Sequence, residues 1–114
     1  DSEDKGVHLM AGLRRAVAEN GVGDRIRISG EPQRSVVSFL GPDPLIDKSF
    51  VQQAMQDAGF LFNGSFFTCA RHTTEELTSA VSAFAGACQV IADAGDDIRR
   101  HLRGQPVEAV FRAP

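Results

Sequence analysis

Apolar positions recur along the chain with two different periods. From about residue 5 to residue 19 they fall three or four apart, as on one face of a helix, and Gly21 follows where such a helix would stop. Residues 25–29 instead alternate charged and apolar side chains, which predicts a strand with one face on a core. Residues 35–40 are richer in β-branched and aromatic side chains. They predict a more central strand, antiparallel to the first because the connection is short.

The middle of the chain repeats the helix and strand signals. A second helix is expected to begin at either Asp43 or Asp47 and to end at Gly59. Asp47 is the preferred cap because the apolar pattern starts just after it. Residues 60–70 hold two apolar runs around Asn63-Gly64-Ser65. This spacing predicts either a hairpin with an Asn-Gly turn or one strand with a bend.

A long amphipathic helix is predicted after this segment. Thr73-Thr74-Glu75-Glu76 has the Thr-x-x-Glu pattern of a capping box, in which two backbone amides at the helix start are satisfied reciprocally. The apolar stripe that follows predicts a helix that reaches Ala94. Acidic and then basic residues over 96–103 predict one or two further helical turns, and residues 104–112 are expected to form an extended edge segment.

The order of these elements predicts an α+β fold. Helix, strand, strand, helix, strand or hairpin, and helix suit a two-layer sandwich, with a small antiparallel or mixed sheet and helices on one face. The 114 residues fit one domain, 1–114, with a single modest core. At 42% hydrophobic and 24% charged residues, the composition is close to the globular average.

The charge pattern and the start of the chain limit location and partners. No basic and then apolar leader opens the sequence, and no apolar run comes near the roughly 20 residues that span a bilayer. We therefore expect a cytoplasmic protein without a membrane partner. A net charge of −3, with scattered Lys and Arg, also predicts no nucleic-acid partner.

No catalytic set can be assembled from the residue pattern alone. His8, His72 and His101 lack an evident partner and are interpreted as structural or solvent-exposed. The only lysines are Lys5, near the start of the chain, and Lys48, expected to be solvated in a helix's first turn. Serine or cysteine nucleophiles need an adjacent base and an oriented third group, and no such arrangement is visible.

The cysteines do not suggest a metal site. Cys69 and Cys88 lie in different predicted elements, without histidines spaced as zinc ligands would be. Two such cysteines also make no disulfide framework. Both are predicted to be buried thiols.

Four landmarks, taken together, give the chain a family resemblance. They are residues 23–39 (GDRIRISGEPQRSVVSF), 47–55 (DKSFVQQAM), 59–64 (GFLFNG) and 72–77 (HTTEEL). In this order and spacing, over about Val7 to Arg112, they resemble the carboxy-terminal segment of class III pyridoxal-phosphate-dependent aminotransferases. Within that class the chain looks most like the glutamate-1-semialdehyde 2,1-aminomutase group.

The resemblance implies that the chain is one part of a fold-type-I enzyme. The larger domain of such an enzyme carries the cofactor lysine and most contacts to pyridoxal phosphate, and the chain would be the smaller, carboxy-terminal domain. It is then expected to contain no catalytic residue, to bind no cofactor and to be inactive alone. Expected partners are its own large domain, a second subunit of a homodimer, and a small amino-acid or amino-ketone substrate. The alternative is a free-standing α+β ligand-binding or regulatory module without catalysis.

The resemblance also implies a substrate-facing position on the strand before His72. Ornithine-type relatives place an arginine there to grip a carboxylate, and the aminomutases place a glutamate. Counting back from His72, this position falls at or next to Gly64, which can do neither and favours an aminotransferase with another substrate. The substrate-side candidates are therefore Asn63, Gly64, Ser65 and Arg71, with Arg71 as a substitute anion binder. No residue is assigned to a cofactor or a metal.

Overall fold

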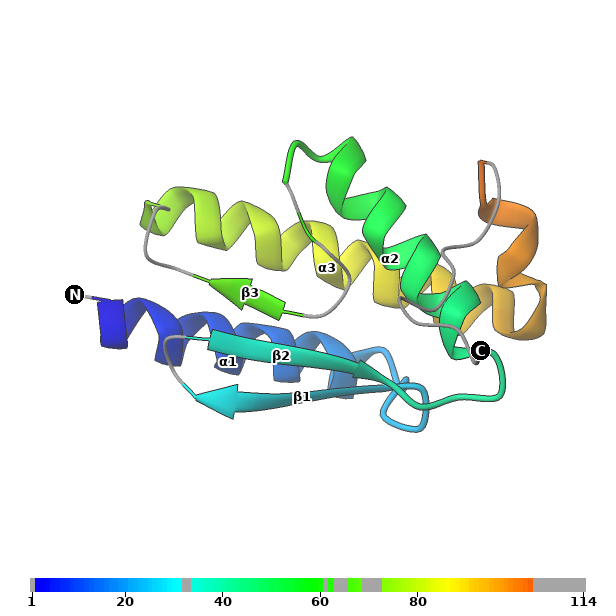
Figure 1. Cartoon of the computed structure of the whole chain (residues 1–114), viewed down its shortest axis with the longest axis horizontal. Helices are drawn as coiled ribbons and strands as arrows, with labels where there is room; N and C mark the ends of the chain where they lie inside the picture. The colour runs from blue at the N-terminus through cyan, green and yellow to red at the C-terminus, as the bar shows by residue number, and fades with distance from the viewer. Residues whose placement is uncertain (1, 32–33, 61, 63–65, 69–72, 104–114) are drawn as a thin grey trace, which may run out of the picture.

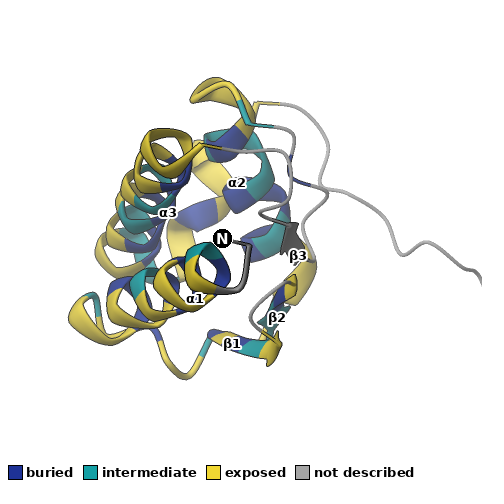
Figure 2. Cartoon of the chain, turned by 90° about the vertical axis from the view of Figure 1, so that its left-hand side faces the viewer, coloured by how far each residue is buried: buried dark blue, intermediate teal, exposed yellow. Residues whose placement is uncertain are grey.

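The computed structural model describes residues 2–31, 34–60, 62, 66–68 and 73–103. Along them run α1 (Ser2–Glu19), β1 (Ile26–Glu31), β2 (Arg34–Phe39), α2 (Pro44–Asp57), β3 (Phe66–Thr68), α3 (Thr74–Ala94) and the 3-10 helix η1 (Gly95–His101). Helices α1, α2 and α3 lie on one face of the strands (Figures 1 and 2). The α+β class predicted from the sequence is confirmed.

The strands form one antiparallel sheet in the order β1-β2-β3. In the β1–β2 hairpin, Ile28 pairs with Val37, and the alternation along both strands sends these two side chains into the core. β3 adds to the other edge of β2, with Phe66 opposite Val36. The central position expected for residues 35–40 is therefore correct, because β2 has a neighbour on each side.

Helix α3 contributes a long stripe of buried side chains to the core. Phe84, near its middle, is fully buried. The buried stripe of the helix consists of Leu77, Ala80, Phe84, Ala87, Cys88 and Ile91. By length and composition the stretch Thr74–His101 is apolar enough to cross a membrane, which differs from the expectation that no run approaches that length. Part of this apolar composition is explained by the buried stripe, which packs in the core of the fold.

Two glycines end helices as the sequence predicts. Gly21 follows α1 with a φ of 68°, and Gly59 follows α2 with a φ of 91°. Only glycine adopts these values without strain. In both cases the next amide donates to a carbonyl five residues earlier, at 3.1 Å after Gly21 and at 2.9 Å after Gly59.

The start of α2 differs from the preferred prediction. The helix begins at Pro44, with Asp43 at the N-cap position, where it makes no side-chain capping bond. Proline suits this first helical position because its φ is already helical and the amide it lacks would have no partner there. Asp47 lies within the first turn and is buried. The preference for Asp47 as the cap is wrong, because its carboxylate turns into the protein.

Other boundaries shift by a few residues. α1 begins at Ser2, three residues before the predicted start, whereas α3 ends at Ala94 as predicted. η1 confirms further helical structure after α3, in the tighter 3-10 form. The choice between a hairpin and a bend at Asn63-Gly64-Ser65 falls outside the described residues, and so does the expected edge segment at 104–112.

Candidate functional site

The substrate-side candidates lie between two described elements. Asn63, Gly64, Ser65 and Arg71 are themselves outside the described residues, so their placement as a site stays a prediction. Immediately before them, Phe62 is buried in the core at 2% exposure. β3 follows Ser65 and pairs with β2, and α3 begins at Thr74, after Arg71. The described neighbours of the candidates in the sequence are therefore Phe62 in the core, β3 and the start of α3.

The start of α3 is fixed by the capping box that the sequence predicts. The Thr73 hydroxyl accepts a hydrogen bond from the Glu76 amide at 3.1 Å, and the Glu76 carboxylate accepts one from the Thr73 amide at 2.8 Å. Two amides that would otherwise face solvent are therefore satisfied within the helix. Glu75 and Glu76 also place two carboxylates in the first turn.

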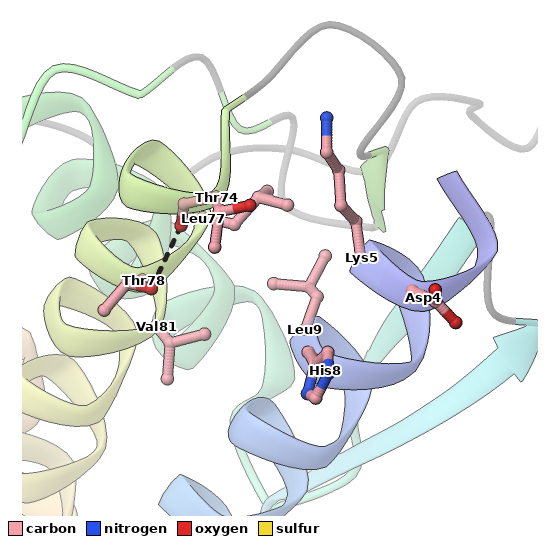
Figure 3. Close-up of a pocket in the computed structure, with 8 residues that line it drawn as sticks. All are labelled: Asp4, Lys5, His8, Leu9, Thr74, Leu77, Thr78 and Val81. Carbon is pink, nitrogen blue, oxygen red and sulfur yellow. Dashed lines mark hydrogen bonds between the residues drawn. The ribbon is translucent and has the colours of Figure 1, made fainter. Parts of the chain in front are cut away.

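A groove of about 320 Å³ opens between α1 and α3 beside this capped end (Figure 3). We call it the α1–α3 groove. Leu9, Leu77 and Val81 give it an apolar floor. The remaining lining is polar and consists of Asp4, Lys5, His8, Thr74 and Thr78. The groove therefore combines an apolar surface with a polar rim, as sites for small ligands do.

The two helices are in tight contact at Gly12, which lies against Val81 at one end of the α1–α3 groove. A Cβ atom built on Gly12 would lie 3.0 Å from Cγ1 of Val81. Such a contact is tighter than an ordinary van der Waals approach. The absence of a side chain at Gly12 thus sets the spacing of the helices at one end of the groove.

The described residues do not fit pyridoxal phosphate. This cofactor needs a Schiff-base lysine, a partner for its ring nitrogen and donors around its phosphate. Lys5 lies on the rim of the α1–α3 groove, but the nearest helix start offers a poor phosphate site. There, Thr73 and Glu76 already occupy each other's amides, and the carboxylates of Glu75 and Glu76 repel a phosphate. Lys48, the other lysine, belongs to α2 and does not line the groove.

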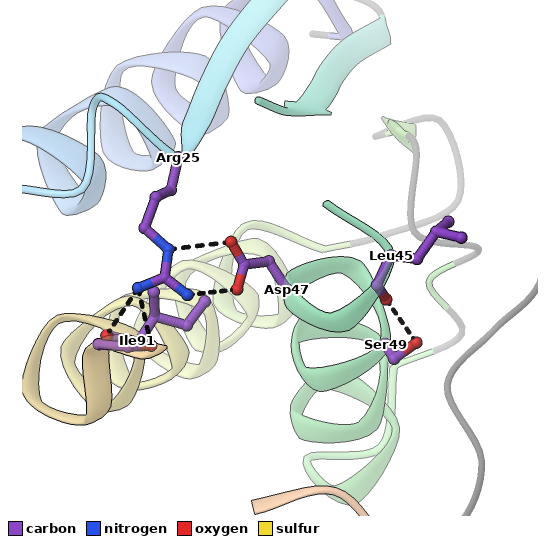
Figure 4. Close-up of polar contacts among 6 residues, drawn as sticks. Arg25, Leu45, Asp47, Ser49 and Ile91 are labelled. Carbon is purple, nitrogen blue, oxygen red and sulfur yellow. Dashed lines mark hydrogen bonds and ion pairs between the residues drawn. The ribbon is translucent and has the colours of Figure 1, made fainter. Parts of the chain in front are cut away.

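A second polar arrangement joins three elements at the other end of α3 (Figure 4). Arg25, just before β1, donates from Nε to Oδ2 of Asp47 at 3.0 Å and from Nη2 to Oδ1 at 2.5 Å. Its Nη1 donates to the carbonyl oxygens of Gly95 at 3.1 Å and of Ile91 at 3.4 Å. We call these four residues the Arg25–Asp47 clamp. The clamp connects the start of β1, the first turn of α2 and the end of α3.

The electrostatics of the Arg25–Asp47 clamp follow from its geometry. The side chains of Arg25 and Asp47 are 15% and 1% exposed. The hydrogen bond to Asp47 is the main cause that raises the pKa of Arg25, and burial opposes it. Arg25 also lies near the negative end of the α3 dipole, where a cation is favoured. The guanidinium therefore stays charged and satisfies both a carboxylate and orphan carbonyls of a helix end.

Gly41 leaves room for the Arg25–Asp47 clamp. A Cβ atom at this position would lie 3.0 Å from Cγ of Arg25 and 3.5 Å from Oδ2 of Asp47. A larger residue would press on the ion pair. The sequence interpretation missed the clamp, because Arg25 was taken as an outward residue of an alternating strand and Asp47 as a cap.

The remaining reactive side chains do not form a catalytic set among the described residues. Burial raises the pKa of the Cys88 thiol to about 12, so Cys88 stays protonated and unreactive at neutral pH, and its predicted burial is confirmed. His8 and His101 are exposed, and the His101 ring meets Phe50 edge-on at a centroid distance of 6.1 Å. Within the described ranges, no three His, Cys, Asp or Glu residues converge on a possible metal. Cys69 and His72 fall outside those ranges.

The chain matches no protein-family model, no curated protein and no solved structure. Its function is therefore argued from its own residues. Two features of the described residues bear on function. They are the α1–α3 groove, which opens beside the start of α3, and the Arg25–Asp47 clamp, which joins β1, α2 and α3.

Proposed function

We propose that this chain is the small, carboxy-terminal domain of a class III pyridoxal-phosphate-dependent aminotransferase or aminomutase-like enzyme. In this role it covers the substrate side of an active site whose cofactor lysine belongs to a large domain. The parent is a cytoplasmic homodimer that acts on a small amino acid or amino ketone. The chain contributes shape and closure, and the cofactor chemistry takes place on the large domain.

The observation that carries the proposal is the way three of the four landmarks fold. Residues 23–39 include the β1–β2 hairpin, residues 47–55 lie in α2, and residues 72–77 include the capping box that starts α3. Three of the four landmarks thus correspond to structural elements of one small α+β fold, and most of the third, 59–64, lies outside the described residues. A chance match of short motifs would not require them to be joined in space.

The Arg25–Asp47 clamp provides this physical connection. Arg25 belongs to the first landmark and Asp47 to the second, and they form a buried ion pair. The same guanidinium bonds the carbonyls at the end of α3, the helix that the fourth landmark begins. The clamp therefore joins the first and second landmarks to the helix that the fourth begins, and these lie on both sides of Asn63, Gly64 and Ser65 in the sequence.

The misfit of pyridoxal phosphate to the described residues supports the proposed division of labour. Among the described residues, Lys5 has no phosphate site beside it, because the helix start nearest to it is capped and acidic. A small domain that only covers the active site needs no lysine or phosphate-binding groups for the cofactor. Its contribution is to exclude water and to place backbone and side chains against the substrate.

The first test locates the cofactor lysine. The protein encoded by the full reading frame is reduced with borohydride in the presence of pyridoxal phosphate and mapped by mass spectrometry. We expect the modified lysine outside residues 1–114, and we expect the isolated chain to show neither a stoichiometric adduct nor amino transfer. Lys5→Arg and Lys48→Arg variants serve as controls for surface labelling. A stoichiometric adduct on the isolated chain that Lys5→Arg abolishes would contradict the proposal.

The second test concerns the substrate side. In the full-length enzyme, Gly64→Arg is expected to change the ratio of kcat/KM between substrates with and without a second carboxylate, because it adds a bidentate anion binder. Gln89→Ala, on the exposed face of α3, is the control. An unchanged ratio in the Gly64→Arg enzyme would remove this position from the substrate side.

A free-standing binding module is the second candidate, and the α1–α3 groove favours it. The groove has the apolar floor and polar rim of a small-ligand site. A module of this kind binds a small ligand at micromolar affinity as the isolated chain, and Val81→Asp, on the groove floor, weakens that binding. A small domain separated from its enzyme instead binds the purified large domain added in trans.

A further inference from the structure

A second groove lies between α2 and α3 and shares no lining residue with the α1–α3 groove. Its volume is about 370 Å³, and apart from Asp57 its lining is apolar. The walls include Phe50 and Ala54 of α2, Ala58 just after α2, and Ala83, Gly86 and Val90 of α3. We call it the α2–α3 groove. Because most of the residues that line it are alanine or glycine, the groove has room for larger apolar side chains from another segment.

The chain that follows η1 is held along the edge of the α2–α3 groove. The Gln53 side chain donates to the His101 carbonyl at 2.8 Å and accepts from the Arg103 amide at 2.8 Å. The His101 ring contacts Phe50, one end of the groove. The Arg103 guanidinium forms a bidentate pair with Asp57, at the other end, with distances of 2.9 and 2.5 Å. Residues 101–103 thus run along α2 from Phe50 toward Asp57.

The next residues have the reach and the composition to enter the α2–α3 groove. Arg103 lies at the rim, and Val107, Val110 and Phe111 follow within eight residues. Eight extended residues span up to about 26 Å. The helix stretch from Phe50 to Asp57 is only about 10 Å long at 1.5 Å per residue. The segment after Arg103 is therefore long enough to reach along the whole groove.

We propose that the segment 104–114 of this chain docks its apolar residues Val107, Val110 and Phe111 in the α2–α3 groove. Gln53 and Asp57 fix the point from which the segment departs. The segment then covers the small side chains of α2 and α3, which are otherwise partly exposed. Docking in the same molecule has a low entropic cost, since the segment is already tethered at the rim.

The full chain offers a clean spectroscopic test, because it contains no Trp and no Tyr. Phe111→Trp introduces a single fluorophore into the segment. If the segment docks, Trp emission is shifted to shorter wavelength than that of an exposed tryptophan, and acrylamide quenching is reduced severalfold. Emission and quenching equal to those of free tryptophan in water would overturn the proposal.

A charge in the groove should release the segment. A Cβ atom at Gly86 meets no atom within 4 Å, so Gly86→Glu fits the helix and places a carboxylate among the apolar walls. In the Phe111→Trp background it should return the emission and quenching to solvent-exposed values. Gln89→Glu, exposed on the same helix and outside the groove, is the matched control and should change neither. Unchanged emission with Gly86→Glu would overturn the proposal.

Two further measurements make the result decisive. Far-UV circular dichroism confirms that the variants are folded, and Ala58→Glu on the opposite wall replaces Gly86→Glu if that variant is not. A dilution series separates docking within one chain from exchange between two copies. A blue shift that disappears on dilution would assign the groove to a second copy and overturn docking within the chain.

Discussion

Two arginine–aspartate pairs of this protein share one geometry and differ in their surroundings. Arg25 with Asp47 and Arg103 with Asp57 are both bidentate, and the shortest contact in each is 2.5 Å. The first pair has side chains that are 15% and 1% exposed, whereas those of the second are 66% and 51% exposed. The geometry of a pair therefore does not tell how much it stabilises the fold, and burial decides this.

The difference comes from what each pair replaces on folding. An exposed pair exchanges water for a partner of similar strength, and salt screens it. A buried pair has lost its water, so the loss of one partner leaves a charge without solvation. The Arg25–Asp47 clamp also satisfies carbonyls of α3, while Arg103 positions the chain beside α2.

The largest effect is expected when Asp47 is removed. Asp47→Ala leaves the Arg25 guanidinium largely buried without its carboxylate and should lower the free energy of unfolding by about 3 kcal/mol. Asp57→Ala, which breaks the exposed pair, should leave the midpoint of urea unfolding almost unchanged. Equal losses in the two variants would show that burial does not distinguish the pairs.

Replacing both partners of the buried pair should cost less than removing one. Arg25→Met combined with Asp47→Leu removes both charges and fills the space with apolar atoms. The double variant is expected to recover at least about 1 kcal/mol of the loss seen in Asp47→Ala. Urea unfolding of the single and double variants measures this. A double variant less stable than Asp47→Ala would mean that the bonds from Arg25 to Ile91 and Gly95 outweigh the ion pair.

Salt should affect the two pairs differently. Between about 0.1 M and 1 M salt the screening length falls from about 10 Å to about 3 Å. The difference in melting temperature between the native chain and Arg103→Ala is expected to vanish over this range. The difference for Asp47→Ala should persist, since solvent ions do not reach the buried carboxylate. Equal sensitivity to salt would argue against the burial of Asp47.

The smallest effect is expected from pH. The hydrogen bond from Arg103 lowers the pKa of Asp57 below its ordinary value of 3.8. A carboxyl with a depressed pKa stabilises the fold above its ordinary pKa, and this contribution is lost as the pH falls through the folded value. The melting temperatures of the native chain and of Arg103→Ala should therefore converge as the pH falls below 3.8. A gap that widens toward acid pH would give the interaction the opposite sign.

Local patterns were sufficient to predict much of the fold. The glycines that end α1 and α2 and the Thr-x-x-Glu start of α3 act within one helical turn, so the sequence around them contains the full signal. The β1–β2 hairpin was also predictable, because its alternation of apolar residues and its short connection are local. Such features depend on neighbours along the chain.

The clamp was not predictable in this way. Arg25 and Asp47 are 22 residues apart, and Arg25 finds its carbonyl partners 66 and 70 residues further along the chain. No periodicity distinguishes Arg25, which turns inward, from the exposed Arg27 two residues later. The placement of Asn63, Gly64, Ser65 and Arg71 on a substrate side came from the family resemblance and stays a prediction.

The long separation between Arg25 and the end of α3 has a kinetic consequence. Closing a loop of this length costs more chain entropy than forming a hairpin, so we expect the clamp to form after the folding transition state. Asp47→Ala should then speed unfolding in stopped-flow experiments while leaving the refolding rate nearly unchanged. A slowed refolding rate would place the clamp in the folding nucleus. We therefore expect the clamp to set the lifetime of the folded chain and to have little influence on the folding rate.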